Sequence, residues 1–292
     1  MENRDEIINA LKAYVDKYPS QNRAAASLKG ISAATLSNIL AGKYEMISDD
    51  MWRSIAAQVA PAAPKGWQIV ETTACQEIHC ALEDAQACKS VRWIVGEAGC
   101  GKTTTAGIYA EEHREVFVVL CDEDMRKSDF VREIARKVGF RSAGMRIRDI
   151  LETAIDRIAA MDEPLLIFDE GDKLNDNVFH YFINLYNRLY GKCGIVFMST
   201  SYIEQRIERG VAANRKGYNE IYSRIGRKFF QLEPTSALDV TAICQANGLT
   251  DRRRISAVIE SSEKSDFDLR CVRSAIHREK RIAASKAKSN NN

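Results

Sequence analysis

The sequence predicts an α/β fold, in which a parallel sheet with flanking helices lies between an N-terminal all-α domain and a small C-terminal helical segment. Residues 67–234 alternate short apolar runs with amphipathic stretches, the order typical of strands and helices in a parallel sheet. The flanks, 1–59 and 235–285, show helical periodicity only. Between the first two segments, "APAAPKG" (60–66) carries two of the chain's five prolines and predicts a linker. The polar end, 286–292, is expected to be disordered.

The composition excludes several classes of protein. The 292 residues contain no apolar run long enough to span a bilayer, and the polar, acidic N-terminus does not resemble a signal peptide. The eight cysteines form no C-x-x-C pair, which favours free thiols over a disulfide framework or a zinc site. We therefore expect a cytoplasmic protein without a membrane partner. A net charge of +2 says little about other partners.

The first flank has the layout of a helix-turn-helix of the lambda-repressor-like kind, at residues 20–42. Ala26 lies four positions before Gly30, which is expected to form the turn. Ile31 is expected to fill the core, and Ser32 to cap a second helix. That helix carries no lysine or arginine before Lys43, so it is poorly equipped to read bases. The alternative is a small bundle that binds protein or nothing. The candidate DNA contacts here are Thr35, Asn38 and Lys43.

The central segment predicts five strands, at 91–95, 116–121, 165–169, 194–199 and 228–232. Each is a short run of mainly apolar residues, and helical patterns lie between consecutive runs. From residue 235 the pattern returns to three helical stretches, which we expect to form a lid.

The first strand leads into "GEAGCGKT", residues 96–103, which matches the phosphate-binding pattern G-x-x-x-x-G-K-[ST]. Glycines let the backbone wrap so that its N–H groups point at phosphate oxygens, and a helix beginning at Lys102 adds its positive dipole end. Lys102 is expected to reach the β- and γ-phosphates, and the Thr103 hydroxyl to hold Mg²⁺. The expected ATP-binding residues of the loop are Gly96, Glu97, Ala98, Gly99, Cys100, Gly101, Lys102, Thr103 and Thr104.

The second half of a hydrolytic site is predicted at the end of the strand "LLIFD", residues 165–169. Asp169 is expected to hold Mg²⁺, and Glu170 to orient and deprotonate the attacking water. A third strand-end group, Ser199 or Thr200, is expected to position that water. The alternative for these two hydroxyls is an ordinary strand-terminal turn.

Arginines follow at two further places. Arg224 and Arg227 precede the last predicted strand, and one of them would reach the γ-phosphate of a neighbouring subunit in an assembled ATPase. Arg270, with Arg273 as the alternative, lies on the C-terminal helical segment, where it can fold back on the nucleotide. Each of these arginines can also be a plain surface charge.

Taken in order, these motifs resemble the AAA+ ATPases and, more narrowly, the phage Mu B type of transposon target-selection ATPase. "IVETTACQEI" (69–78), which includes Val70, is similar to the segment that leads into the first strand in that family. "LLIFDEGDKLND", "IYSRIGRKF" and "DLRCVRSAI" are similar to its acidic strand, arginine-finger segment and sensor-arginine region. One departure is Ser-Thr at the end of strand 194–199, where the family carries Gly-Asn and where Thr200 falls on the Asn position.

The resemblance implies an ATP- and Mg²⁺-dependent ATPase that binds double-stranded DNA without sequence specificity. It implies helical filaments on that DNA, delivery of the DNA as target to a DDE-type transposase, and stimulation of the transposase. It places the protein in a bacterium, a phage or a mobile element. Two alternatives stay open: a helicase loader or replication initiator, and a transcription regulator that ATP switches.

Two loops of the central segment are the further candidates for DNA contact. "EDMRKSD" follows the second strand and "RSAGMRIRD" follows the next helix, and both are expected near the carboxyl end of the sheet. Their basic residues would contact phosphates, and repetition of subunits along DNA would multiply a few contacts each. Solvated surface charge is the alternative. The candidates are Arg126, Lys127, Arg141, Arg146 and Arg148.

Overall fold

The computed structural model describes residues 4–44, 47–59, 66–179 and 181–289. Within it the chain divides into two compact units, Met1–Gln68 and Ile69–Asn292. Residues 60–65 of the predicted linker lie outside the described residues. All eight cysteines are free thiols, in agreement with the sequence.

The first unit is a bundle of four helices with its own apolar core. Leu11, Leu36, Ile39 and Ile55 are fully buried in it. The helices are α1 (Arg4–Val15), α2 (Gln21–Ser27), α3 (Ala33–Leu40) and α4 (Asp49–Val59).

The turn between α2 and α3 agrees with the helix-turn-helix layout. Gly30 has a φ of +73°, which favours glycine, and Ile31 is buried. The Ser32 hydroxyl accepts a hydrogen bond from the Thr35 amide at 3.0 Å and so caps α3. The small side chains buried in α2 are Ala24 and Ala25, whereas Ala26 is exposed.

The second unit is built on a five-stranded parallel sheet of order β2-β3-β4-β1-β5, which confirms the predicted fold class. Four strands have the predicted extent to within one residue, whereas β5 is only two residues long. The strands are β1 (Val91–Val95), β2 (Val116–Leu120), β3 (Leu165–Asp169), β4 (Gly194–Ser199) and β5 (Phe230–Gln231).

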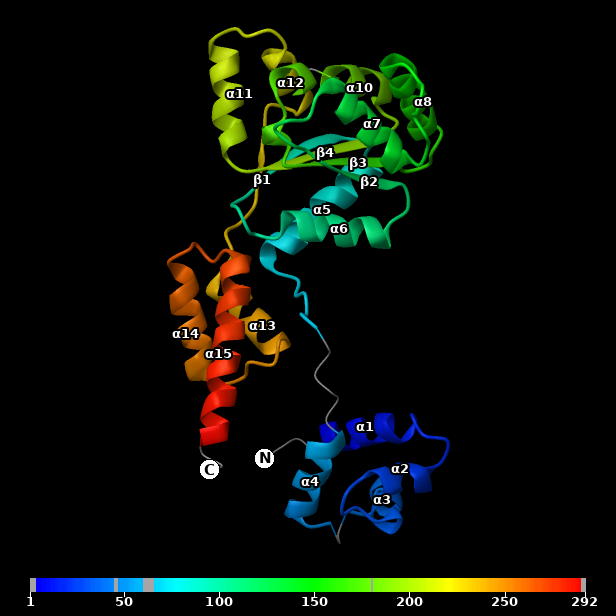
Figure 1. The fold of residues 1–292 in the computed structure, drawn as a ribbon, viewed down its shortest axis with the longest axis vertical. Coiled ribbons are helices and arrows are strands. Elements are labelled where there is room, and N and C mark those ends of the chain that lie inside the picture. Colours follow the sequence, from blue (N-terminus) through cyan, green and yellow to red (C-terminus); the bar gives the residue numbers. More distant parts are fainter. Residues whose placement is uncertain (1–3, 45–46, 60–65, 180, 290–292) are drawn as a thin grey trace. The chain divides into compact units, whose positions relative to one another are not determined.

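Helices cover both faces of this sheet (Figure 1). Leu165 and Ile167 of β3 pack into the apolar cluster of α5 and α6, while Leu166 and Phe168 pack into the cluster on the opposite face. Alternate residues of a strand point to opposite faces, so a strand covered on both sides is a continuous apolar run. The helices are α5 (Thr73–Ala87), α6 (Lys102–Glu112), α7 (Lys127–Val138), α8 (Ile147–Ala159), the 3₁₀ turn η1 (Gly171–Lys173), α9 (Asp176–Phe179), α10 (Tyr181–Leu189), α11 (Tyr202–Ala212) and α12 (Tyr218–Arg224).

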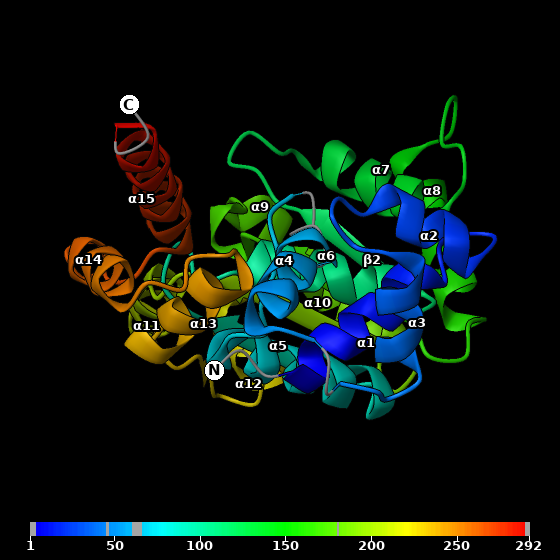
Figure 2. The same ribbon diagram turned by 90° about the horizontal axis from the view of Figure 1, so that it is seen from below.

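Three C-terminal helices form the lid, and they lie together in both views of the ribbon (Figures 1 and 2). They are α13 (Ala237–Ala246), α14 (Arg252–Glu263) and α15 (Leu269–Ser289). Helix α15 continues to Ser289, past the start of the tail predicted to be disordered at residue 286, and 290–292 lie outside the described residues. Among the described residues, no helix combines the length and apolar character that a membrane crossing needs.

The buried Asp239 connects the lid to the segment that begins α5. Its Oδ1 accepts a hydrogen bond from the Thr73 amide at 2.9 Å, and its Oδ2 accepts one from the Ser236 hydroxyl at 2.7 Å. Burial raises the pKa of Asp239, but the hydrogen bonds from Ser236 and Thr73 outweigh it, so the net pKa lies below its ordinary value.

Candidate active site

The phosphate loop joins β1 to α6, as predicted, and its backbone needs glycine. Gly99 and Gly101 have φ values of +77° and +104°. A Cβ on Gly99 would lie 2.2 Å from the carboxyl carbon of Asp268, and one on Gly96 would lie 2.7 Å from Cδ1 of Leu232. Asp268, just before α15, and Leu232, just after β5, therefore leave no room for a side chain at these two glycines.

Lys102 lies over the loop. Its Nζ donates hydrogen bonds to the carbonyl oxygens of Gly96 at 2.7 Å and Glu97 at 2.8 Å. Cys100 is buried beneath it, whereas Glu97, Ala98 and Thr104 are exposed at the loop surface. A mobile ammonium beside a loop of backbone N–H groups, at the start of a helix, fits a polyphosphate.

Thr103 and Asp169 meet at the carboxyl end of the sheet. The Thr103 hydroxyl donates to Oδ2 of Asp169 at 2.6 Å, so the phosphate loop and the acidic strand form one site. Burial raises the pKa of Asp169 and the charge of Glu170 adds to this, although hydrogen bonds from Thr103 and the Glu170 amide oppose it. A hydroxyl oxygen beside a carboxylate is the donor set that suits Mg²⁺, which prefers oxygen ligands and keeps several waters.

Glu170 follows in a strained conformation. It has a φ of +56° and a ψ of +39°, the left-handed region that a residue with a side chain seldom adopts. Its amide donates to Oδ1 of Asp169 at 3.0 Å, and its carboxylate forms an ion pair with Lys173 of η1. The carboxylate therefore sits beside the Thr103–Asp169 contact but is held by Lys173, a lysine that no sequence motif marks.

Between Ser199 and Thr200, the structure favours Thr200 as the group that faces the acidic turn. Ser199 is buried, and its hydroxyl accepts a hydrogen bond from Nε1 of Trp93 at 2.7 Å. The Thr200 hydroxyl donates to Oδ2 of Asp172 in η1 at 2.9 Å.

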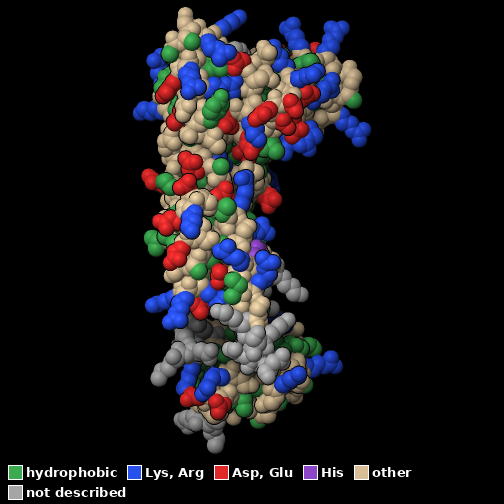
Figure 3. Space-filling view, turned by 60° about the vertical axis from the view of Figure 1, so that its left-hand side comes forward, with side chains coloured by type: hydrophobic (Ala, Val, Ile, Leu, Met, Phe, Trp, Pro, Cys, Tyr) green, Lys and Arg blue, Asp and Glu red, His purple; other side chains and the backbone are tan. Residues whose placement is uncertain are grey.

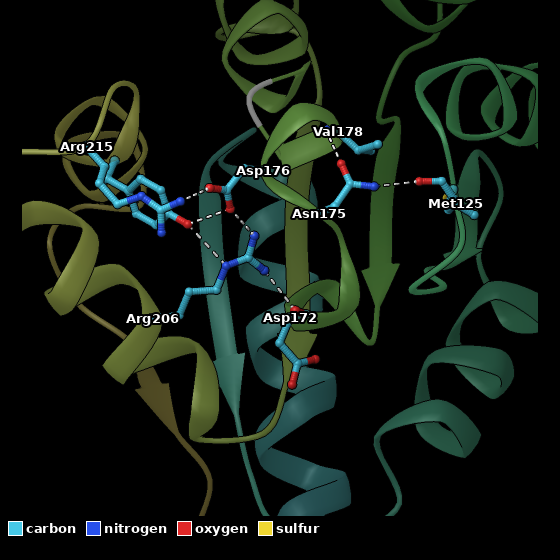
Figure 4. A network of polar contacts seen from close by, with 8 residues as sticks. Met125, Asp172, Asn175, Asp176, Val178, Arg206 and Arg215 are labelled. Carbon is cyan, nitrogen blue, oxygen red and sulfur yellow. Dashed lines mark hydrogen bonds and ion pairs between the residues drawn. The ribbon is translucent and has the colours of Figure 1, made fainter.

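A polar network extends from this turn to α11 and α12 (Figure 4). Arg206 donates to the carbonyl oxygen of Asp172 at 2.9 Å and to Oδ1 of Asp176 at 2.8 Å. Asp176 also accepts from the Tyr218 hydroxyl and from Arg215, each at 2.7 Å. The network fixes the acidic turn against the helix that carries Arg224. No motif of the sequence marks Arg206, whose one signal is that it is a lone arginine on the apolar face of α11.

The two finger candidates differ in their surroundings. Arg224 is largely buried, donates to Oδ1 of Asn187 at 3.0 Å and to the Glu220 carbonyl at 3.0 Å, and stacks on Tyr186. Arg227 is exposed and has a φ of +56°, and its side chain makes no hydrogen bond or ion pair with the residues that the structure describes.

Arg224 also lines a pocket of about 370 Å³ with Ser90 and Val91 at the start of β1 and with Ile195 at the start of β4. The phosphate loop follows the carboxyl end of β1, whereas the starts of the parallel strands lie at the amino end of the sheet, on its opposite side. Arg224 therefore lies far from the phosphate loop of its own chain.

The lid touches the phosphate loop at the start of α15. The Leu269 amide donates to the Gly99 carbonyl at 3.1 Å, and the Arg270 amide donates to Oδ1 of Asp268 at 2.7 Å. The side chains of Arg270 and Arg273 are both exposed, and Arg270 is the nearer to the loop along the helix. Val70, half-buried, precedes α5.

The predicted DNA-contacting residues of this unit are all exposed, but one of their two loops is placed differently from the prediction. Arg126 and Lys127 follow the carboxyl end of β2, as expected, and the Lys127 ammonium lies 5.3 Å from the Tyr181 ring centre. The loop between α7 and α8 spans the height of the sheet instead of lying at its carboxyl end. Its first residue, Gly139, contacts Arg157 near the end of α8, just before β3 begins, which places the adjacent Arg141 near the amino end.

Arg146 and Arg148 lie at the other end of α8, which at 13 residues is about 20 Å long. On the face drawn in Figure 3, Lys and Arg side chains stand at scattered positions with Asp and Glu side chains between them. Charge alone therefore does not mark a DNA path on that face.

In the first unit, Asn38 is exposed on α3, the second helix of the pair, and Lys43 is exposed just after that helix ends. The Thr35 hydroxyl is instead 2.8 Å from the Ser32 hydroxyl and shares in the cap of α3. The Thr35 hydroxyl is thus less available to contact DNA than a side chain that points outward, as predicted for Thr35, would be.

Comparisons with known proteins agree with this geometry. A family model described as an AAA domain matches residues 89–207. The Mu-like prophage FluMu DNA transposition protein B of Haemophilus influenzae is 26% identical over 273 residues, covering 91% of this chain and 93% of that protein. The ATP-dependent target DNA activator B of Escherichia phage Mu is 23% identical over 269 residues, covering 90% and 84%.

Among solved structures, the Orc1 protein of Aeropyrum pernix in complex with DNA aligns with a TM-score of 0.55 at 17% identity. The alignment covers 76% of this chain and 63%, less than two thirds, of the solved chain. At this identity the likeness shows the shared fold alone.

Proposed function

We propose that this AAA+ ATPase of the phage Mu B type binds double-stranded DNA when it holds ATP, with little regard to sequence. It assembles along the DNA as a helical filament, delivers that DNA to a transposase as target, and stimulates the transposase. The observation that carries the proposal is the Thr103–Asp169 contact beside Glu170, because it gives a hydrolytic site to a chain that resembles a target DNA activator along most of its length.

The chain's own side chains account for the proposed hydrolysis. Bound Mg²⁺, held by Thr103 and Asp169, would neutralise charge on the phosphates. Lys102 exchanges the carbonyls of Gly96 and Glu97 for β- and γ-phosphate oxygens. Glu170 leaves Lys173 and accepts the proton of the attacking water, and Thr200, fixed on Asp172, positions that water.

The assembly supplies what one chain lacks. Arg224 lies near the edge of the sheet opposite its own phosphate loop, and Arg227 follows it by one short turn. Either arginine therefore acts on the γ-phosphate of a neighbouring subunit, and hydrolysis depends on self-association. Arg227 can do so as it stands, whereas Arg224 must first leave Asn187 and Glu220. Arg270, close to the phosphate loop at the start of α15, completes the site from the lid.

DNA contacts come from exposed basic side chains of the ATPase unit. The chief candidates are Arg126, Lys127, Arg146 and Arg148, and Arg141 is a further one, nearer the amino end of the sheet. Phosphate contacts of this kind carry no sequence information. The first unit adds Asn38 and Lys43, too few groups for strong readout of bases.

Fluorescence anisotropy on a long mixed-sequence duplex, with ATP, ADP or no nucleotide, tests the proposal. Tight binding only with ATP, of similar strength on unrelated duplexes and lost in Lys102→Ala, is the expected result. Binding to one sequence without nucleotide would favour a transcription regulator instead. A preference for single strands would favour a helicase loader.

Mixing of variants tests the arginine finger. Glu170→Gln lacks the general base but keeps its finger, while Arg227→Ala and Arg224→Ala keep the base. Glu170→Gln and the true finger variant are each expected to be inactive alone, and their mixture regains ATP hydrolysis. Lys228→Ala, an exposed neighbour, is the matched control. An arginine variant that hydrolyses ATP at the wild-type rate excludes that arginine.

A further inference from the structure

A cluster of two histidines and a glutamate lies away from the nucleotide site, and we propose that it binds a zinc-class divalent metal ion. His79 and Glu83 are four residues apart on α5, and His113 immediately follows α6. One potential ligand atom from each of the three side chains lies within 4.8 Å of the others. Two imidazoles and a carboxylate are a common donor set for zinc that keeps a fourth position for water.

The distances are close to those of a coordinated ion. Nδ1 of His79 lies 3.6 Å from Oε1 of Glu83. Ligand bonds of about 2.0–2.2 Å in a tetrahedron place two donor atoms roughly 3.3 Å apart. Separations of no more than 4.8 Å thus need a closure of at most about 1.5 Å. The His79 and Glu83 side chains are 35% and 54% exposed, so burial does not lock either in place.

The contact that His113 makes with its own helix selects the tautomer that a ligand needs. Its Nδ1 lies 3.0 Å from the carbonyl oxygen of Tyr109. A carbonyl oxygen only accepts, so Nδ1 carries the proton and Nε2 presents its lone pair. Metal-bound histidines commonly make this second hydrogen bond to a backbone carbonyl. The ring also stacks on Tyr109 with centres 3.9 Å apart, which fixes its plane.

The surroundings attract a cation. A pocket of about 750 Å³ shares Glu83 and His113 with the cluster. Three more acidic residues and one basic residue also line the pocket, so its net charge is negative. The acidic residues are Glu115, Asp162 and Glu163, and the basic residue is Arg114. The pocket also gives water access to the open coordination position.

The ion is different from the Mg²⁺ of the nucleotide site. Imidazole nitrogens suit zinc and its neighbours, whereas Mg²⁺ requires oxygen ligands. The cluster also lies at the far end of α6 from Thr103, about 15 Å along the helix axis. Its metal would join α5 to the end of the helix whose first turn carries Lys102 and Thr103. The bound metal would thereby stabilise the position of α6 relative to α5.

Titration of the full chain with Co²⁺ and Zn²⁺ tests the site. Chelator-treated protein is first alkylated at its exposed thiols (Cys80, Cys88 and Cys271), because free thiolates also bind these ions. One equivalent of Co²⁺ is expected to give the visible absorption of a four- or five-coordinate ion. Zn²⁺ is expected to displace it, and a large excess of Mg²⁺ to leave it in place.

Variants assign the ligands. His79→Ala and His113→Ala are each expected to lower Zn²⁺ affinity at least tenfold, and Glu83→Gln to lower it less. His277→Ala, which removes a histidine of α15, leaves the affinity unchanged. Retention of ATP binding by each variant shows that it is folded. No stoichiometric binding by wild type, equal affinity in all variants, or displacement of Co²⁺ by Mg²⁺ would each overturn the proposal.

Discussion

The Thr103 hydroxyl donates a hydrogen bond to the Asp169 carboxylate across 2.6 Å, although 66 residues separate the two in the chain. Two features bring them together. Parallel strands end at one edge of the sheet, and β4 is the one strand between β1, which leads to Thr103, and β3, which ends at Asp169. This contact unites the two motifs on which the proposed ATP hydrolysis rests.

Thr103→Ala removes the hydroxyl from this pair and leaves the buried Asp169 without that partner. We expect ATP hydrolysis to fall at least about 100-fold, the scale of losing one group that stabilises the transition state. Nucleotide binding without Mg²⁺ should change little. Phosphate release measures the first effect and a fluorescent nucleotide the second. Thr153→Ala, a half-buried threonine of α8, is the control, and hydrolysis within twofold of wild type in Thr103→Ala would contradict the assignment.

Lys173→Gln removes the cation that holds Glu170. Both side chains are about 40% exposed, so the ion pair stabilises the resting position by at most about 1 kcal/mol. Basal ATP hydrolysis is therefore expected to rise by up to about fivefold, because 1.36 kcal/mol corresponds to a factor of ten. Steady-state assays without DNA measure the change. A lower rate would mean that Lys173 assists catalysis instead of restraining Glu170.

Asp239→Asn tests the link between the lid and α5. The amide cannot accept the same set of hydrogen bonds from Thr73 and Ser236, and we expect a loss of about 1–2 kcal/mol in the free energy of unfolding near pH 7. The folded pKa of Asp239 is lowered, so its contribution is complete above the unfolded value of about 3.9 and declines as pH falls through the folded value.

The difference between wild type and Asp239→Asn in urea unfolding should therefore be constant above about pH 5 and shrink below about pH 4. Asp156→Asn on the exposed face of α8 is the control and should show no such difference. A difference that grows as the pH falls would have the wrong sign for this account.

Arg126→Ala and Arg146→Ala test the DNA path. The proposal gives each arginine one phosphate contact per subunit, so binding should weaken to the same extent on every duplex. The dependence of log affinity on log salt should become less steep by about 1 per site. Arg253→Ala in the lid, equally exposed, is the comparison. Equal effects of all three changes would show that net charge, and not these positions, governs binding.

Much of the fold was predictable because the strands are apolar on both faces. A run such as "LLIF" before Asp169 predicts a buried strand, because it is short, wholly apolar and followed at once by acidic residues and a glycine. The phosphate loop, Asp169 and Glu170 were predictable for a related reason, since their chemistry fixes both residue type and place on the sheet.

The remaining features depend on tertiary contacts that carry little sequence signal. Lys173 resembles any surface lysine until the left-handed turn at Glu170 brings the two side chains together. The return of the 139–146 loop across the sheet follows from the packing of α7 on α8, and no residue type encodes it. Arg224 is less exposed than Arg227 because Asn187 and Tyr186, which lie on another helix, contact its side chain.

The central claim is that ATP binding places this protein on DNA and that hydrolysis through Glu170 releases it. The direct measurement is the lifetime of protein–duplex complexes formed with ATP and then diluted into competitor DNA, for wild type and Glu170→Gln. The account predicts that Glu170→Gln binds as tightly as wild type and dissociates at least tenfold more slowly. Equal lifetimes, or binding by either protein that is as tight with ADP as with ATP, would contradict it.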